Sequence, residues 1–403
     1  MTLLSLIRRN LRQGGLATAL TILSLSLAVG LLLCVWVLQA ESERAFQNST
    51  GPFDGVLGAR SSSLQLVLNA LFHLEDWPGT IPMEDYQDIA ANPAVKHAIP
   101  LAGGDNYRGY RIVGTDPKLF SEVEFQPGEP FRLQSGGRLF APDLQEAVIG
   151  SYVADQLGLQ LGDIFHPYHG LGFDEGHRHE EEYVVVGILE PTNSPFDRVL
   201  WIPLRGIQHM SGHDPALADR LSAVLVTFVE GSAAGQRLNI LYNRQGDRLT
   251  FAWPVPLIVN RFLERFDWVF TLFQILAWTL TAVAMTTILV SLYHAMESRR
   301  REIAVFRALG ARRATITGMF AGEGFFLALG GVAGGFLIFL LLFQIAGRVL
   351  QDQAGVVLEI NFHHPALLWV PLGVLLLGTV SGLLPGLRAY ALPTSRLLQD
   401  KGL

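Results

Sequence analysis

Long runs of hydrophobic residues without charge dominate the pattern along the chain. Four runs are long enough to cross a bilayer, since a spanning helix needs about 20 mostly apolar residues. They cover residues 16–38, 268–296, 314–346 and 366–387. Pro371 and Pro385 bracket the fourth run, and membrane helices tolerate proline where neighbouring groups satisfy the freed carbonyls. The pattern therefore predicts four transmembrane helices.

The first run is interpreted as a retained anchor and not as a cleaved signal peptide. Arg8, Arg9 and Arg12 precede it, as a basic region precedes a signal sequence. The apolar stretch is longer than the roughly 7–15 residues typical of a signal peptide. We therefore expect it to stay in the membrane.

The polar stretch between the first two runs, residues 39–267, is long enough to bury a core of its own. Its pattern predicts a mixed α+β domain. Helices are expected at 83–91, 151–157 and 233–242, the second closed by Gly158. Strands are expected at 110–113, 147–150, 183–189, 199–202 and 221–229. Residues 347–365 form a second, short external loop in this interpretation.

Positive charge predicts the orientation of the spans. Half of the 403 residues are hydrophobic and only 16% are charged. Lys and Arg gather before the first run, in the loop at 297–313, and in the tail at 388–403, which all fall on one side if four helices alternate. Cytoplasmic loops carry such an excess, so both termini are expected in the cytoplasm and residues 39–267 in the periplasm. The net charge of −6 gives no reason to expect a nucleic-acid partner.

The loop at 297–313 is the most informative stretch for function. It is basic, and Ile303, Val305, Phe306 and Leu309 are expected to form a short apolar helix face that Gly310 ends. A short helix held between two membrane spans cannot move independently of them, so a protein that grips it would move the spans. The alternative is a basic loop that lies on the headgroups of membrane lipid.

The sequence RRREIAVFRALGARR at residues 299–313 resembles the signature cytoplasmic loop of the FtsX/MacB superfamily of ABC-transporter permeases. The order of one helix, a large external domain and three helices is also that of MacB-type permeases. Segments 114–117, 146–150, 157–163 and 185–189 are similar to parts of the MacB core domain. By this resemblance, residues 1–15 form a cytoplasmic amphipathic helix, 39–267 a MacB-like periplasmic domain, and 268–403 an FtsX-like permease domain.

The resemblance implies a bacterial inner-membrane permease subunit that is not itself an enzyme and binds no cofactor. A separate cytoplasmic ATPase in two copies would bind ATP and Mg²⁺ and transmit motion to the periplasmic domain (mechanotransmission) for export, efflux or lipoprotein extraction. A homodimer and a periplasmic adaptor or binding protein are the further expected partners. An FtsX-like signal transducer remains the alternative. The implied ATPase-coupling residues are Arg299, Arg300, Arg301, Glu302, Ile303, Val305, Phe306, Arg307, Leu309 and Gly310.

Glycines spaced four apart mark the faces on which the later spans are expected to pack. Gly330 and Gly334 form one such pair, and Gly378 and Gly382 another. Small residues at this spacing let helix backbones approach closely in lipid, either between two copies of the chain or within one. Glu323, at the membrane edge, is expected to act as a structural polar anchor.

A histidine-rich segment is the one stretch that suggests metal chemistry. His166, His169, His177 and His179 lie close together, with five carboxylates between residues 174 and 182. Imidazole and carboxylate ligands suit zinc, so these histidines are candidate zinc ligands in a metal-linked transport component or a membrane-anchored metalloenzyme. The alternative is a solvated polar loop. Catalytic sequence motifs such as the P-loop or HExxH do not occur, and the single cysteine, Cys34, cannot form a disulfide within the chain.

Overall fold

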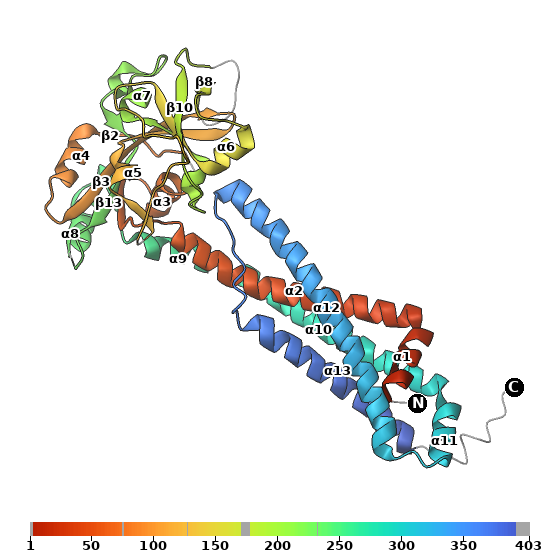
Figure 1. Cartoon of the computed structure of the whole chain (residues 1–403). Helices are drawn as coiled ribbons and strands as arrows, with labels where there is room; N and C mark the ends of the chain where they lie inside the picture. The colour runs from red at the N-terminus through yellow and green to blue at the C-terminus, as the bar shows by residue number, and fades with distance from the viewer. Residues whose placement is uncertain (1–2, 75, 127, 171–177, 232, 392–403) are drawn as a thin grey trace. The chain divides into compact units, whose positions relative to one another are not determined.

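The computed structural model describes residues 3–74, 76–126, 128–170, 178–231 and 233–391. The chain divides into two compact units (Figure 1). Unit 1 comprises Met1–Glu41, Phe266–Gly347 and Glu359–Leu403, and unit 2 comprises Ser42–Arg265 and Arg348–Leu358. Unit 1 is built of helices, whereas unit 2 combines a sheet with short helices.

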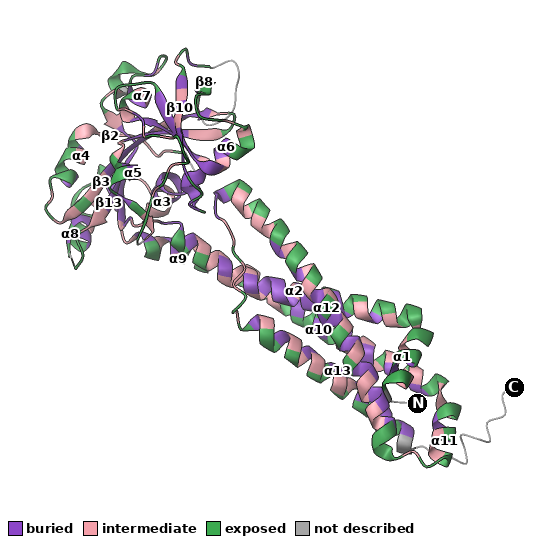
Figure 2. Ribbon diagram, viewed as in Figure 1, coloured by how far each residue is buried: buried purple, intermediate pink, exposed green. Residues whose placement is uncertain are grey.

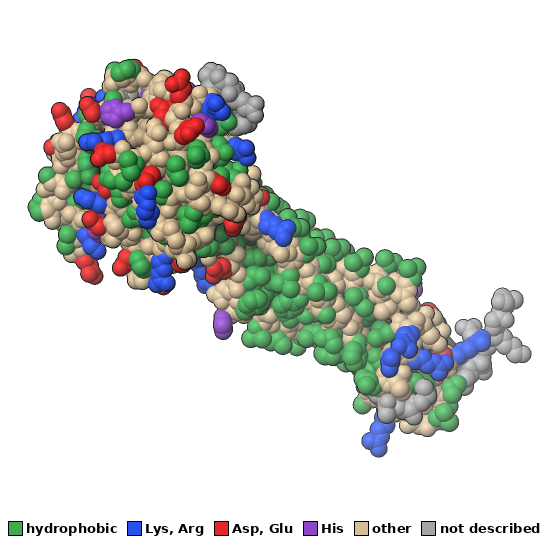
Figure 3. Space-filling model, turned by 45° about the horizontal axis from the view of Figure 1, so that its top comes forward, with side chains coloured by type: hydrophobic (Ala, Val, Ile, Leu, Met, Phe, Trp, Pro, Cys, Tyr) green, Lys and Arg blue, Asp and Glu red, His purple; other side chains and the backbone are tan. Residues whose placement is uncertain are grey.

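Among the described residues, four helices are long and apolar enough to cross a membrane. They are α2 (Gly15–Asn48), α10 (Asp267–Ser298), α12 (Arg313–Ala354) and α13 (Ala366–Ala391), and two shorter helices, α1 (Leu3–Gln13) and α11 (Arg300–Ala308), accompany them. Hydrophobic side chains predominate on the face of the long helices seen in Figure 3. The four predicted spans are thus present, but α2 and α12 extend past their predicted ends at residues 38 and 346. An apolar run marks only the membrane portion of a helix, and polar residues can continue it.

The predicted glycine faces pack within the chain. A Cβ atom added at Gly330 would lie 3.0 Å from the side chain of Ile22 on α2, and one at Gly334 would lie 2.3 Å from Ser26. On α13, a Cβ atom at Gly382 would lie 2.2 Å from the carbonyl oxygen of Phe320, and one at Gly378 would lie 2.5 Å from Cβ of Ala328 on α12. These glycines therefore let α12 approach both α2 and α13, and the intrachain alternative accounts for them.

Unit 2 contains, within the described residues, a ten-stranded mixed sheet in the order β14-β1-β13-β3-β4-β11-β7-β10-β8, with β9 paired to β3. Neighbouring strands pair antiparallel, except that β11 runs parallel to β4 and β10 parallel to β7. The strands are β1 (Gly55–Ala59), β3 (Val95–Tyr107), β4 (Tyr110–Thr115), β7 (Glu146–Ile149), β8 (Ile164–Phe165), β9 (Tyr168–His169), β10 (Tyr183–Ile188), β11 (Leu200–Pro203), β13 (Ala223–Phe228) and β14 (Leu249–Ala252). Short pairs β2 (Ile81–Pro82) with β12 (Arg220–Leu221), and β5 (Glu124–Gln126) with β6 (Glu129–Pro130), lie outside this sheet.

Helices cover both faces of the large sheet, and the strands are buried between them (Figure 2). On β13, Ala223 and Leu225 belong to the core under α3 (Ser63–Ala70) and α9 (Val255–Glu264). Val224 and Val226 point to the opposite face, because successive strand residues alternate. That second face is covered by α4 (Met83–Ala90), α6 (Ser151–Leu157), α7 (Leu204–Gln208) and α8 (Ala234–Ile240); one further helix is α5 (Lys118–Ser121).

Local sequence signals predicted several elements of unit 2 correctly. The helix α6 has its predicted bounds, and Gly158 closes it with a left-handed φ of 67°. The predicted helix at 83–91 is α4, which begins after Pro82. The long strand β3 was not predicted, because Pro100, Gly103 and Gly104 resemble turn signals. The pairing of β3 with β4 shifts register between Gly103 and Asp105, and this bulge precedes a buried carboxylate of the candidate site.

Candidate functional site

Helix α11 presents its apolar residues on two sides, and not on the single face expected. Ile303 is 2% exposed and packs in a cluster with residues of α1, α10, α12 and α13. Ala304 beside it is fully buried. Val305 and Leu309 are 49% and 80% exposed, and their spacing of four places them on one helix face. Ile303 therefore anchors α11 to unit 1, and Val305 and Leu309 are accessible to a partner.

The end of α11 is closed by the backbone in the way its sequence suggests. Gly310 has a left-handed φ of 89°, which favours glycine. Its amide donates to the carbonyl of Arg307 at 3.0 Å, and the amide of Ala311 donates to the carbonyl of Phe306 at 2.9 Å. This pair of hydrogen bonds is a Schellman motif, which ends the helix at Ala308 with Leu309 as its C-cap. The exposed side chain of Leu309 is thus held in a defined position at the C-terminal end of α11.

The other predicted coupling residues differ in accessibility. Arg301 and Glu302 are exposed, whereas Phe306 and Arg307 are half-buried. Arg300 forms an ion pair with Glu297 one turn earlier, at 2.5 Å. The accessible surface of α11 therefore combines apolar, basic and acidic groups.

Arg299, between α10 and α11, is part of a buried polar network. Its Nη1 donates to Glu323 Oε1 on α12 at 2.8 Å, and its Nη2 donates to the carbonyl of Asn10 on α1 at 3.1 Å. The side-chain amide of Asn10 also donates to Glu323 Oε1, at 2.6 Å. Glu323 is only 2% exposed, so the network fixes α1 and the start of α11 to α12. The expected role of Glu323 as a polar anchor agrees with these partners.

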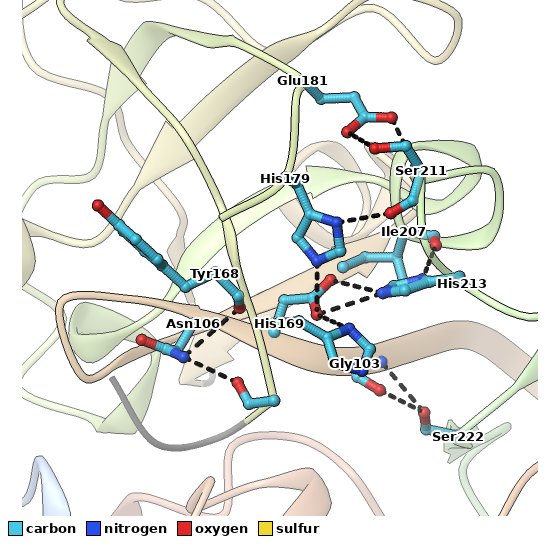
Figure 4. A network of polar contacts seen from close by, with 12 residues as sticks. Gly103, Asn106, Tyr168, His169, His179, Glu181, Ile207, Ser211, His213 and Ser222 are labelled. Atoms are coloured by element: carbon cyan, nitrogen blue, oxygen red, sulfur yellow. Dashed lines mark hydrogen bonds and ion pairs between the residues drawn. The ribbon is translucent and has the colours of Figure 1, made fainter. Parts of the chain in front are cut away.

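The histidine-rich segment contributes two of its four predicted ligands to a cluster in unit 2. His169 on β9 and His179 before β10 converge with Asp105 on β3 and His213 after α7 (Figure 4). One potential ligand atom from each residue lies within 4.8 Å of the others. The structure does not bring His166 into this cluster, and its Nε2 lies 3.5 Å from Glu182. His177 lies outside the described residues.

The cluster is centred on the fully buried carboxylate of Asp105. Asp105 Oδ1 lies 3.5 Å from His169 Nδ1, 3.4 Å from His179 Nε2 and 3.3 Å from His213 Nε2. The other oxygen, Oδ2, has no hydrogen-bond donor in the described structure, although His213 Nε2 is 3.2 Å away. The rings of the three histidines are 5.1–5.4 Å apart between centroids.

Mutual electrostatics shift the protonation of these groups. Burial alone would raise the pKa of Asp105, but hydrogen bonds from His179 and His213 and their charge outweigh it and hold that pKa below its ordinary value. The hydrogen bond to Asp105 raises the pKa of His179 and of His213 against the opposing effect of burial. The site therefore favours a carboxylate surrounded by positive charge.

The sequence pattern identified neither His213 nor Asp105 as a candidate ligand. The two residues are 108 positions apart in sequence and meet only through the sheet and the turn after α7. The pairing of β9 with β3, which sets Asp105 opposite His169, carries no local sequence signal.

The comparisons with known proteins agree with the resemblance seen in the sequence. A family model described as an FtsX-like permease C-terminal region matches residues 274–394, and one described as a MacB-like periplasmic core domain matches residues 18–236. No curated protein sequence matches the chain.

Two solved structures are similar to part of the chain. The periplasmic region of MacB from Actinobacillus actinomycetemcomitans aligns with 53% of this chain and 94% of its own, at 12% identity and a TM-score of 0.35. The extracellular domain of the noncanonic ABC-type transporter YknZ from Gram-positive bacteria aligns with 49% of this chain and 97% of its own, at 16% identity and a TM-score of 0.31. The MacB-like model alone spans more than half of the chain. The chain therefore belongs to the FtsX/MacB-like family of ABC-transporter permeases, multi-pass inner-membrane subunits that work with a partner ATPase.

Proposed function

We propose that this chain is a transporter subunit driven by a cytoplasmic ATPase that docks on α11. The observation that carries the proposal is the division of α11 into a buried side and an accessible side. Ile303 and Ala304 fix the helix to the bundle, whereas Val305 and Leu309 offer an exposed apolar pair beside the charged Glu302. An exposed apolar pair rimmed by polar groups is typical of a protein contact.

Movement of α11 would reach the spans through covalent and buried connections. Only Arg299 separates α11 from α10. Its side chain donates hydrogen bonds to Glu323 on α12 and to the carbonyl of Asn10 on α1. The helices α2 and α12 each continue without interruption from unit 1 into unit 2. A helix transmits displacement along its axis because every turn is hydrogen-bonded to the next. These connections support mechanotransmission, in which the ATPase moves unit 2 without passing substrate through the bilayer.

The proposal places α11 and both termini in the cytoplasm and the large domain in the periplasm. The excess of Lys and Arg beside the spans supports this orientation. A dimer of the chain with two ATPase copies follows from the resemblance to MacB-type permeases. The match of a MacB-like core domain supports export, efflux or extraction more than the signalling alternative.

A site-directed crosslink tests the docking face. Cys34 is the single cysteine and is buried on α2, so a Cys34→Ala background allows one reactive thiol to be placed at will. Ala308→Cys is at an exposed position near the end of α11. Ala304→Cys, one turn earlier and fully buried, provides the matched control. In native membranes we expect a short crosslinker at position 308, and not at 304, to capture an ABC ATPase identified by mass spectrometry.

Two results would refute the assignment. The first is equal capture, or none, at the two positions. The second is labelling of Ala308→Cys in intact cells by a thiol reagent that cannot cross the inner membrane, since this would place α11 on the periplasmic side. A functional control is Leu309→Asp, which should abolish stimulation of the ATPase, compared with Thr315→Asp at an exposed position in the first turn of α12.

A further inference from the structure

We propose that Asp105, His169, His179 and His213 form a binding site for a divalent zinc-class cation in unit 2. These four residues come from β3, β9, the segment before β10 and the turn after α7. Neutral imidazole nitrogen and carboxylate oxygen are ligands that zinc prefers. The site is independent of the docking of an ATPase on α11.

The hydrogen bonds behind two of the histidines dictate which nitrogen faces the centre. His179 Nδ1 lies 2.6 Å from the carbonyl oxygen of Ser211, and His213 Nδ1 lies 2.9 Å from that of Ile207. A carbonyl only accepts hydrogen bonds, so both Nδ1 atoms carry the proton. In a neutral imidazole the other nitrogen, Nε2, then carries a lone pair.

Both Nε2 lone pairs therefore face the carboxylate of Asp105, which is itself only an acceptor when ionised. Acceptors that meet in this way need positive charge between them. A bound cation supplies that charge and can also contact Oδ2 of the buried carboxylate, which has no hydrogen-bond donor in the described structure.

The distances from the three histidines to Asp105 are those between ligands of one metal ion more than those of direct hydrogen bonds. Zinc binds nitrogen and oxygen at about 2.0–2.1 Å, so neighbouring ligand atoms of a tetrahedron are about 3.3 Å apart. The nitrogens of His169, His179 and His213 lie 3.2–3.5 Å from the nearest oxygen of Asp105. Hydrogen bonds between nitrogen and oxygen are usually about 2.9–3.0 Å long.

Groups behind the ligands hold them in place. Glu181 accepts hydrogen bonds from the amide and the hydroxyl of Ser211, whose carbonyl orients His179. The side-chain amide of Asn106 donates to the carbonyl of Gly170, next to His169, at 2.8 Å. Such partners fix the ring orientation and the tautomer of a ligating histidine, and they are a regular feature of metal sites in proteins.

The ligand set suggests reversible binding and not catalysis. Four protein ligands fill a tetrahedron and leave no open position for a water molecule, unlike catalytic zinc sites. Asp105 and His179 are buried, with side-chain exposures of 0% and 5%, whereas His169 is 53% exposed. An ion can therefore enter and leave past His169, while the filled coordination shell argues against the metalloenzyme alternative.

Metal titration of the full-length protein tests the proposal. The chain is purified in detergent with a tag that lacks histidine, stripped with a chelator, and titrated with Zn²⁺ by competition with a chromophoric chelator. We expect one Zn²⁺ per chain. Co²⁺ in its place should give the intense visible absorption of a tetrahedral site. His213→Gln should weaken Zn²⁺ binding by at least about 100-fold.

Two variants distinguish the loss of a metal ligand from misfolding and from the loss of a histidine outside the site. His169→Gln removes the exposed ligand, so it should fold normally yet lose the Co²⁺ absorption. His166→Gln, from the same segment but paired with Glu182, should bind Zn²⁺ within about three-fold of the parent protein. The proposal is overturned if the parent protein binds no Zn²⁺, or if His166→Gln loses binding while His213→Gln and His169→Gln retain it.

Discussion

Replacing Arg299 by methionine should destabilise unit 1 far more than removing another arginine from the same loop. Methionine keeps much of the length of the side chain but removes both hydrogen bonds to Glu323 and Asn10. Glu323 is 2% exposed and would lose its counter-charge. Arg312→Met is the matched control, because Arg312 is exposed in the described structure.

The size of the effect follows from burial. Removing one partner of a buried ion pair costs about 3–5 kcal/mol, because the remaining charge is left uncompensated. Arg299 is 13% exposed, which admits some water, so we expect about 3 kcal/mol for Arg299→Met. Asn10→Ala removes a single hydrogen bond to the carboxylate and should cost about 1.5–2 kcal/mol. Arg312→Met should change stability by less than about 0.5 kcal/mol.

A double variant distinguishes the ion pair from simple loss of packing. With Glu323→Met added to Arg299→Met, neither charge of the ion pair remains. The free energy of unfolding of this double variant should therefore be within about 1 kcal/mol of that of the parent protein. Unfolding in detergent micelles, followed by tryptophan fluorescence, measures all of these variants. The reasoning fails if Arg299→Met lowers the stability no more than Arg312→Met does. It also fails if the double variant loses as much stability as Arg299→Met and Glu323→Met lose together.

Two further predictions concern packing and acid stability. Gly382→Ala, whose Cβ would lie 2.2 Å from a backbone oxygen of α12, should cost about 1–3 kcal/mol in the same assay, whereas Gly373→Ala, with open space around it, should be near neutral. Burial, together with the charges of Arg111 and Arg198, lowers the pKa of His73 to about 3, so between its ordinary pKa and 3 only the unfolded chain is protonated. His73 should therefore contribute a loss of about 2 kcal/mol to the free energy of unfolding of unit 2 between pH 7 and pH 5. Over this range the parent protein should lose more stability than His73→Asn in thermal unfolding, and equal changes in the two proteins would contradict the role of His73.

The features that the sequence predicts well are those that local chemistry determines. The four spans follow from uncharged runs, since a polar backbone can cross a bilayer only as a helix or a closed barrel. The bounds of α6 follow from Gly158, and the end of α11 from Gly310. The strand β3 could not be found in this way, because its proline and glycines oppose strand formation locally. Pairing with β13 and β4 stabilises it nevertheless.

The same contrast applies within the candidate sites. On α11, the sequence identifies the helix and its apolar residues, but the burial of Ile303 depends on four other helices and is visible only in the structure. In the histidine cluster, His169 and His179 were found because they lie in one segment. His213 and Asp105 reach the cluster through tertiary pairing, whereas His166, from the same segment as His169, lies beside Glu182 and outside the cluster.

The two sites make different physical demands, which keeps their tests separate. Docking on α11 needs an exposed surface in unit 1, whereas metal binding needs four side chains in unit 2 to keep their relative positions. A cation that binds only the folded state stabilises it by mass action, by about 4 kcal/mol at a thousand-fold excess over its dissociation constant. The four ligands come from separate parts of the chain: His169 and His179 lie on either side of residues 170–178, and Asp105 and His213 belong to other segments. Stabilisation by the cation therefore requires that the fold of unit 2 hold these segments together. A variant of Leu309 should leave it unchanged, just as a variant of His169 should leave the contact of α11 with its ATPase unchanged.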